Sequence, residues 1–200
     1  MSRNSDDTRQ RLLDAALQEL LDQGFVGFGI NAIARRAGCD KKLIYRYFDG
    51  LDGLVEAMGR SAATRLEEAL SPHLDPPPAS YAALMERLAL ALFDHLASDP
   101  LYRQIRLMEA TAPPALTDGF RTARGQALQH WLASARGALA PPAGLDAATA
   151  NALLIAAIEG VTVLSPAGLD PADPATRVRL RRALADLVRA AYRDGPHHTP

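Results

Sequence analysis

Two short helices joined by a tight turn are indicated by the stretch from Ile33 to Phe48, which reads IARRAGCDKKLIYRYF. Gly38 allows a sharp change of direction between them, because glycine adopts left-handed backbone conformations without strain. Asp40 is placed to cap the second helix by accepting a hydrogen bond from the amide of Leu43. Helices this short are not stable in isolation, so both are expected to pack on a neighbouring helix. The stretch therefore predicts a helix-turn-helix.

The neighbouring helix is expected just upstream, from about Asp7 to Gln23, and Gly24 is placed to end it. Its leucines recur on one helical face and need apolar partners. The partners available downstream are Phe25, Ile33, Ala34, Ala37, Ile44 and Phe48. We therefore expect residues 1–50 to form a three-helix domain that binds DNA.

The rest of the chain is divided by prolines and glycines into segments of 3.6-residue periodicity, and none shows the sustained alternation of a strand. The predicted fold class is all-α, with a larger helical domain over residues 51–200. Beyond the first helix, we expect helices at about 30–37, 40–48, 51–70, 80–97, 100–109, 114–140, 146–164 and 174–192.

A local cationic surface is required if the chain binds nucleic acid, because its net charge is only -1. Such a surface is predicted within residues 35–47, where a single acid, Asp40, is opposed by Arg35, Arg36, Lys41, Lys42 and Arg46. Lys41 and Lys42 are the only lysines in the chain.

Several other classes of function find no support in the residues. Cys39 is the only cysteine, which excludes an intramolecular disulfide and a thiolate metal cluster, and the five histidines lack metal-ligand spacing. The chain has no Gly-rich phosphate loop, nucleophile elbow or His/acid constellation. We therefore expect no catalytic residues, no metal, no cofactor and no enzyme. With no signal peptide and no uninterrupted apolar run of membrane-spanning length, we expect a cytoplasmic protein without a membrane partner.

The stretch from Ile33 to Phe48 resembles the helix-turn-helix signature of the TetR family of transcriptional regulators, and the helices that follow are similar to that family's regulatory domain. The resemblance implies a homodimer whose third helices enter successive major grooves of a palindromic operator in double-stranded DNA. It also implies a pocket for a largely apolar small molecule that releases the DNA, as in a repressor.

The resemblance also implies roles for individual residues. Lys41, Lys42 and Leu43 stand where the family meets base edges, which lysine amines and an apolar side chain can read. Tyr45, Arg46 and Tyr47 stand where the family reaches phosphates or flanking bases. The expected DNA-binding set is completed by Asn31, Arg35 and Arg36.

Two positions depart from the family pattern. Gly29 stands where a Thr or Ser often caps the second helix, and Leu51 stands where a lysine often binds phosphate. Phosphate contacts would then be weaker, or would shift to Arg3, Arg9, Arg35 and Arg36.

Two apolar stripes near the C-terminus are suited to dimerisation as a four-helix bundle. One is formed by Leu154, Ile158 and Val161, and the other by Leu184, Leu187 and Val188. The alternative is that both stripes face the core of their own chain.

Residues that mix apolar bulk with polar groups are candidates for a ligand pocket: Phe93, Tyr102, Arg106, Glu109, Phe120, Trp131 and Glu159. Glu159 interrupts an apolar run, so we expect it to meet an arginine, a cationic ligand or its dimer mate. The competing function is that of a dimeric DNA-binding protein without a small-molecule inducer, either controlled by a protein partner or constitutive.

Overall fold

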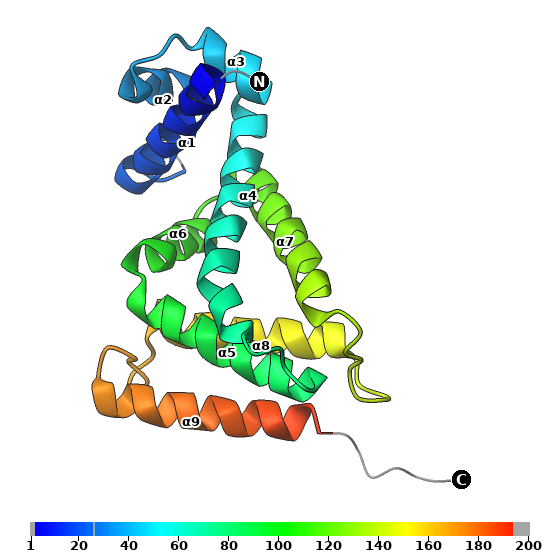
Figure 1. The fold of residues 1–200 in the computed structure, drawn as a ribbon. Coiled ribbons are helices and arrows are strands. Elements are labelled where there is room, and N and C mark those ends of the chain that lie inside the picture. The colour runs from blue at the N-terminus through cyan, green and yellow to red at the C-terminus, as the bar shows by residue number, and fades with distance from the viewer. Residues whose placement is uncertain (1–2, 26, 194–200) are drawn as a thin grey trace. The chain divides into compact units, whose positions relative to one another are not determined.

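The computed structural model describes residues 3–25 and 27–193, without the side chains of Arg3, Asn4 and Leu116. All regular structure within these ranges is helical (Figure 1), which confirms the predicted fold class. The elements are α1 (Arg3–Gln23), α2 (Ile30–Ala37), α3 (Lys42–Phe48), α4 (Leu51–Leu70), a 3-10 turn (Ser71–Leu74), α5 (Tyr81–Ser98), α6 (Pro100–Thr111), α7 (Pro114–Arg136), α8 (Ala147–Leu164) and α9 (Pro174–Ala191).

The start of α3 differs from the prediction. The Asp40 carboxylate accepts a hydrogen bond from the amide of Lys42 at 2.8 Å, and not from that of Leu43. The Leu43 amide instead donates to the backbone carbonyl of Asp40 at 2.9 Å. The chain thus enters the helix through a tight i to i+3 turn, which brings the carboxylate one residue short of the expected partner.

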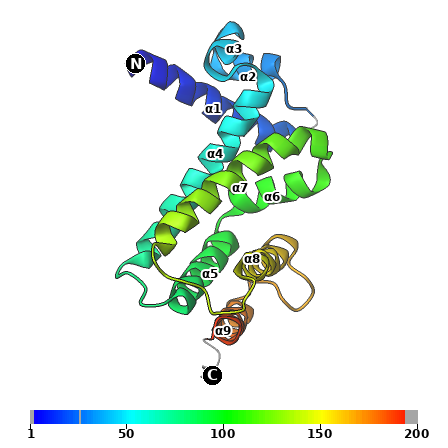
Figure 2. The ribbon, with the colours of Figure 1, turned by 90° about the vertical axis from the view of Figure 1, so that its right-hand side faces the viewer.

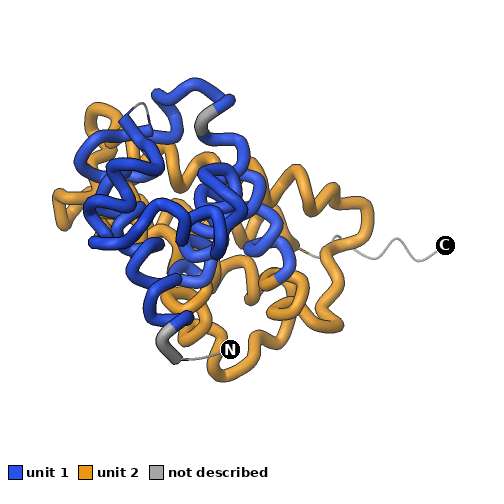
Figure 3. The backbone as a smooth tube through the Cα atoms, turned by 90° about the horizontal axis from the view of Figure 1, so that it is seen from above, with its two compact units in different colours: residues 1–66, 104–130 blue, residues 67–103, 131–200 orange. Residues whose placement is uncertain are grey.

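The chain folds into two compact units, shown in Figure 3. Unit 1 contains residues 1–66 and 104–130, and unit 2 contains residues 67–103 and 131–200. This division by packing differs from the predicted boundary at residue 50, because α4 packs with part of α7. A Cβ atom added to Gly59 of α4 would lie 2.3 Å from the Phe120 carbonyl of α7, so the two backbones are in close contact there.

Unit 1 has its core where α1, α2, α3 and α4 meet, and the two views show α4 beside α7 (Figures 1 and 2). Leu12, Leu20, Ile33, Ile44 and Leu54 are fully buried. The Phe25 ring packs edge-on against Phe120 at 6.1 Å, which ties the end of α1 to α7. The predicted apolar face of α1 is therefore covered, because the short helices α2 and α3 pack against it.

Unit 2 has its core between α5, α8 and α9, around residues such as Phe93 and Leu96. A polar network crosses this core: the Tyr192 hydroxyl donates to Asn151 Oδ1 at 2.6 Å, and Asn151 Nδ2 donates to the Tyr81 hydroxyl at 3.0 Å. Burial raises the pKa of Tyr192 to about 12, so its phenol stays protonated at neutral pH and can donate this bond. The network fixes one register between the three helices.

The angle between α3 and α4 depends on a glycine. Asp49 ends α3 with φ 61°, in the left-handed region that aspartate tolerates, and Gly50 follows with φ 110°. A Cβ atom on Gly53 would lie 1.8 Å from the Phe48 carbonyl oxygen, so the first turn of α4 contacts the last carbonyl of α3 directly. Only glycine permits this approach without a backbone shift.

The first prediction concerns this contact. Gly53→Ala should destabilise unit 1 by about 1 to 3 kcal/mol, because the added methyl group forces the two backbones apart. Gly125 is the matched control, since it lies in α7 with no atom within 4 Å of an added Cβ. Gly125→Ala should stabilise the protein by about 0.5 to 1 kcal/mol through helix propensity alone. Urea unfolding of both variants measures the difference, and equal gains in stability would contradict the close approach.

Candidate nucleic-acid interface

The turn between α2 and α3 has the geometry expected from its glycine. Gly38 has φ 62°, and the amides of Gly38 and Cys39 donate to the carbonyls of Arg35 and Ala34 at 3.2 and 3.0 Å. These bonds satisfy the last carbonyls of α2. Gly29 begins α2 in extended conformation, and no side chain caps that end. Ile33 and Ala34 of α2 and Ile44 and Phe48 of α3 are buried, so the exposed side chains of both helices lie on their opposite faces.

The outward face carries most of the residues predicted to bind DNA. Leu43 and Tyr47 are half-buried, and exposed positions are held by Asn31, Arg35, Lys41, Lys42, Tyr45 and Arg46. Tyr45 is 57% exposed, which is unusual for an aromatic side chain that could pack instead. Within the described ranges, no ion pair involves the cations at positions 35, 41, 42 and 46. The arrangement leaves four positive charges and a phenol available to an anionic partner.

Arg36 has a different role from the one predicted. Its Nε donates to Glu19 Oε2 at 2.7 Å and its Nη2 donates to Asp22 Oδ2 at 2.7 Å. The hydrogen bond to Glu19, with that to Asp22, raises the pKa of Arg36. Glu19 is only 5% exposed, so it needs a cation beside it. Arg36 therefore ties α2 to α1 and is not part of the free cationic surface. The signal for this pair was Glu19 itself, a carboxylate beside Leu20 on the apolar side of the first helix.

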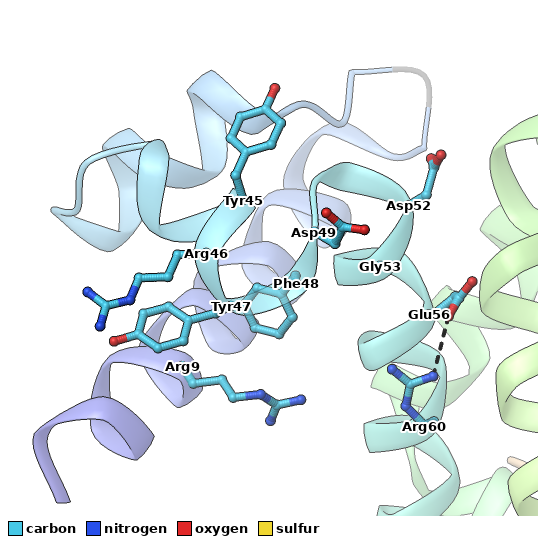
Figure 4. A pocket seen from close by; sticks show the side chains of 10 residues that line it. All are labelled: Arg9, Tyr45, Arg46, Tyr47, Phe48, Asp49, Asp52, Gly53, Glu56 and Arg60. Atoms are coloured by element: carbon cyan, nitrogen blue, oxygen red, sulfur yellow. Dashed lines mark hydrogen bonds and ion pairs between the residues drawn. The ribbon is translucent and has the colours of Figure 1, made fainter. Parts of the chain in front are cut away.

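An open groove of about 670 Å³ lies beside this surface, and Figure 4 shows its lining. We call it the α3–α4 groove. Its walls are formed by Arg9, Tyr45, Arg46, Tyr47, Phe48, Asp49, Asp52, Gly53, Glu56 and Arg60. Sequence reasoning had named Arg9 only as a possible substitute for a missing lysine and had not named the acids. The groove brings residues of α1, α3 and α4 together within unit 1.

The predicted ligand residues are divided between the two units. Unit 1 holds Arg106, Glu109 and Phe120, and unit 2 holds Phe93, Tyr102, Trp131 and Glu159. Glu109 is buried, and its Oε2 accepts hydrogen bonds from Arg106 and, at 2.7 Å, from Arg124. The other oxygen, Oε1, is buried without a hydrogen-bond partner among the described residues. Neither the α3–α4 groove nor a second groove of about 420 Å³ between α5 and α9 is lined by the predicted residues.

The predicted dimer residues lie mostly inside unit 2. Ile158, Leu184 and Val188 are buried in its core, and Leu154 and Val161 pack against that core. Only Leu187 is exposed, at 67%. For five of the six residues the structure thus corrects the prediction in favour of the alternative, an intrachain core. The reason is that α5 lies against both stripes and covers them.

The opposite side of α8 is apolar and exposed. Leu153 and Leu164 are each 67% exposed, and Ile155 is 43% exposed. Among the described helices α8 alone is long and apolar enough to cross a membrane by length and composition, with a mean hydropathy of 1.7, and 11% of it is buried. The helix is not an uninterrupted apolar run, because Thr149, Asn151 and Glu159 lie within it, and core helices of soluble proteins meet the same two criteria. No group of three or more His, Cys, Asp or Glu side chains among the described residues could hold a metal ion.

The comparison with protein families concerns the segment that forms this interface. Residues 12–58 match the model of the bacterial regulatory proteins of the tetR family. This segment of the chain is therefore similar to the DNA-binding segment of the tetR family. The expected resemblance is thereby confirmed, and the match includes α2, α3 and the first turns of α4.

Individual relatives are similar over the same part of the chain. The HTH-type transcriptional regulator BetI of Cronobacter sakazakii is 38% identical over 68 residues, which cover 34% of each protein. SrpR of Pseudomonas putida, also an HTH-type transcriptional regulator, is 34% identical over 70 residues, covering 35% of this chain and 33% of SrpR. The matches thus span about a third of the length of these relatives, both of which are named as transcriptional regulators.

Solved structures are similar over nearly the whole chain. GusR of Salmonella enterica superposes with a TM-score of 0.66 at 19% identity, over 93% of this chain and 95% of GusR. FadR of Bacillus subtilis, solved with stearoyl-CoA, gives a TM-score of 0.62 at 16% identity, over 92% of this chain and 99% of FadR. At these identities the likeness concerns the fold alone, and it includes the helices beyond residue 58.

A second prediction follows from the position of Arg36. Arg36→Gln should lower the free energy of unfolding, because it leaves the buried carboxylate of Glu19 without its cation. Arg35→Gln, one residue away on the exposed face, should leave stability nearly unchanged. Adding Glu19→Gln to Arg36→Gln should recover part of the decrease, since it removes the uncompensated charge. Thermal unfolding of the four proteins tests the pair, and an equal decrease for both arginine variants would contradict the assignment.

Proposed function

We propose that this chain is a DNA-binding transcriptional regulator of the TetR family that binds a palindromic operator as a homodimer and represses until a small molecule releases it. The observation that carries the proposal is the surface of α2 and α3, where Arg35, Lys41, Lys42 and Arg46 have no acidic partner among the described residues. In a chain of net charge -1, such a surface concentrates the positive charge that phosphates require.

The chemistry of α3 supports reading of bases as well as binding of phosphates. Lys41 and Lys42 lie at the start of the helix, which is the end that enters the major groove in helix-turn-helix proteins. Lysine amines can donate to guanine O6 and N7, and Leu43 can contact a thymine methyl group. Tyr45 and Tyr47 offer hydroxyl donors to phosphate oxygens. Arg35 lies in the last turn of α2, where it can contact a phosphate of the DNA backbone.

Dimerisation is supported by the exposed apolar side of α8 and α9. Leu153, Ala157, Gly160 and Leu164 recur along one face of α8, and an added Cβ on Gly160 would meet no atom within 4 Å. On α9 the exposed residue Leu187 follows Ala183 by one helical turn. Large apolar side chains on a stripe with small residues suit close packing against a second copy of the same helices. The proposed dimer surface therefore keeps Leu187 of the predicted stripes and otherwise uses residues next to them.

Release by a small molecule is proposed by analogy with neighbours of the same fold, since FadR was solved with stearoyl-CoA and EbrR is described as a multidrug binding protein. The alternative is a dimeric DNA-binding protein that has no inducer. A panel of apolar compounds screened for shifts in melting temperature distinguishes the two functions. A true effector must also lower the protein's affinity for DNA, and operator DNA must lower the protein's affinity for the effector by the same factor.

The third prediction tests base reading. Lys41→Ala and Lys42→Ala should each cost about 1 to 3 kcal/mol on an operator and relax the preference at one position of each half-site. Arg35→Ala is the matched control, because removing a phosphate-binding side chain should weaken operator and random DNA alike. Operators are first selected from a random library, and binding is then titrated on operator variants. A uniform decrease in affinity for the lysine variants would assign them to phosphates and move the base reading to Asn31, Leu43 and Arg46.

The fourth prediction tests the dimer surface. Leu153→Glu and Leu187→Glu should give folded monomers, because each places a charge on the exposed stripe without disturbing the core. Leu169→Glu is the control, since this leucine is 37% exposed in a loop outside the stripes. Light scattering gives the mass and circular dichroism confirms folding. Dimers of unchanged affinity in both stripe variants would place the interface elsewhere.

A further inference from the structure

A second basic surface lies in unit 2, on α9. The helix carries five arginines and a single acid. Arg177 and Arg181 share the carboxylate of Asp94 on α5, and Arg189 pairs with Glu86 on the same helix. Since two acids of α5 and the one acid of α9 are set against five arginines, an excess of positive charge remains on α9.

The open groove of about 420 Å³ between α5 and α9 follows this surface, and we call it the α5–α9 groove. The two helices run side by side (Figure 1). On the α9 side the groove is lined at intervals of three or four residues by Val178, Arg182, Ala185 and Arg189, which therefore share one helical face. Leu90 adds apolar surface from α5. The groove thus extends for about 16 Å along α9, or roughly three helical turns.

Two residues of this face are available to a partner. Val178 is 68% exposed. Arg182 is exposed, and no ion pair within residues 3–25 and 27–193 involves it. The nearby carboxylates of Glu86 and Asp186 pair with Arg189 instead. The groove therefore offers an apolar side chain and, one helical turn away, a guanidinium without a carboxylate.

The groove lies away from the proposed dimer surface of α9. Leu187 follows Val178 by nine residues, which is about two and a half helical turns, so the two side chains point to opposite sides of the helix. A dimer that buries Leu187 therefore leaves Val178 and Arg182 exposed to a further partner.

The chemistry of the groove fits an amphipathic helix that carries acidic residues. Such helices place apolar side chains into open grooves at intervals of three or four residues. An apolar side chain can lie against Val178 and Leu90. A carboxylate one turn away can then accept two hydrogen bonds from the guanidinium of Arg182.

Two other kinds of ligand fit the groove less well. A small molecule needs a concave site that buries most of its surface, whereas this groove is open. A nucleic acid would bring regularly spaced phosphates past the carboxylates of Glu86 and Asp186, which also line the groove. A peptide can avoid this repulsion, because it can present a neutral or basic residue at those two positions.

We propose that the α5–α9 groove binds an acidic amphipathic helix of a protein partner, with an apolar side chain against Val178 and Leu90 and a carboxylate on Arg182. The proposal adds a protein-binding surface to this chain, and it depends neither on the proposed binding of DNA nor on a small-molecule effector.

The test uses the full-length protein and a phage-displayed library of alanine-based helices with one randomised face. Panning on the wild type, with Arg182→Glu as the counter-target, should enrich glutamate or aspartate one turn from a large apolar residue. An enriched peptide is then labelled, and its Kd is measured by fluorescence anisotropy. Arg182→Glu and Val178→Asp should each weaken binding by about tenfold or more, because each places a like charge against the acidic helix. Circular dichroism confirms that both variants fold.

The matched control is Arg179→Glu, since Arg179 is an exposed arginine of the same helix and lies outside the groove. It alters the net charge as Arg182→Glu does and should leave the Kd unchanged. A peptide whose acid is replaced by lysine should bind Arg182→Glu more tightly than it binds the wild type. Equal weakening by Arg179→Glu and Arg182→Glu would overturn the proposal in favour of a general charge effect.

Three further results would also overturn the proposal. A library that yields no peptide dependent on Arg182 would remove the acidic helix as the occupant. If random-sequence duplex DNA displaced the peptide and Arg182→Glu weakened duplex binding, the groove would serve nucleic acid. If Val178→Asp converted dimers into monomers in light scattering, the occupant would be a second copy of this chain.

Discussion

The contact between the first turn of α4 and the last carbonyl of α3 is the constraint on which the interface depends. The helix α3 has only seven residues and cannot hold its own orientation, so the neighbouring elements must fix it. Ile44 anchors it to the core of unit 1, and the close approach of Gly53 to Phe48 fixes its end. Because the turn through Asp49 and Gly50 uses left-handed backbone, the chain reverses within two residues. The α3–α4 groove is a consequence of this short connection.

The distribution of charge within the chain is also constrained. A protein of net charge -1 can present a cationic surface only if acids elsewhere in the chain balance that charge, and many of its other arginines lie beside such acids. Arg36 is paired with Glu19 and Asp22, and Arg124 with Glu109. In unit 2, Arg189 pairs with Glu86 and Arg177 with Asp94. The cations of α3 differ from these in having no such partner among the described residues, although the sequence around them is equally rich in arginine.

The sequence allowed the helices and the helix-turn-helix to be predicted because both depend on local signals. Leucine periodicity, the glycine at position 38 and the aspartate-proline pair before α9 each act within a few residues, and the bounds of α2 and α4 agree with the expected ones. The role of Arg36 could not be read in this way, since its partners lie 14 and 17 residues away on another helix. The apolar stripes of α8 and α9 are a second case in which local sequence signals do not identify the packing partner. Periodicity identifies an apolar face, but it does not say whether α5 or a second copy covers it.

The exposed side of α8 connects the two halves of the proposed function. With only the cations of α2 and α3 in each protomer, a single copy neutralises few phosphates, so its affinity for DNA is low. Joining two copies makes the second binding event intramolecular, so its effective concentration replaces the concentration of free protein. The cost is an apolar surface that a monomer would expose to water at Leu153 and Leu164. In the proposed dimer that surface would be buried, and the second copy would supply a second recognition helix at the same time.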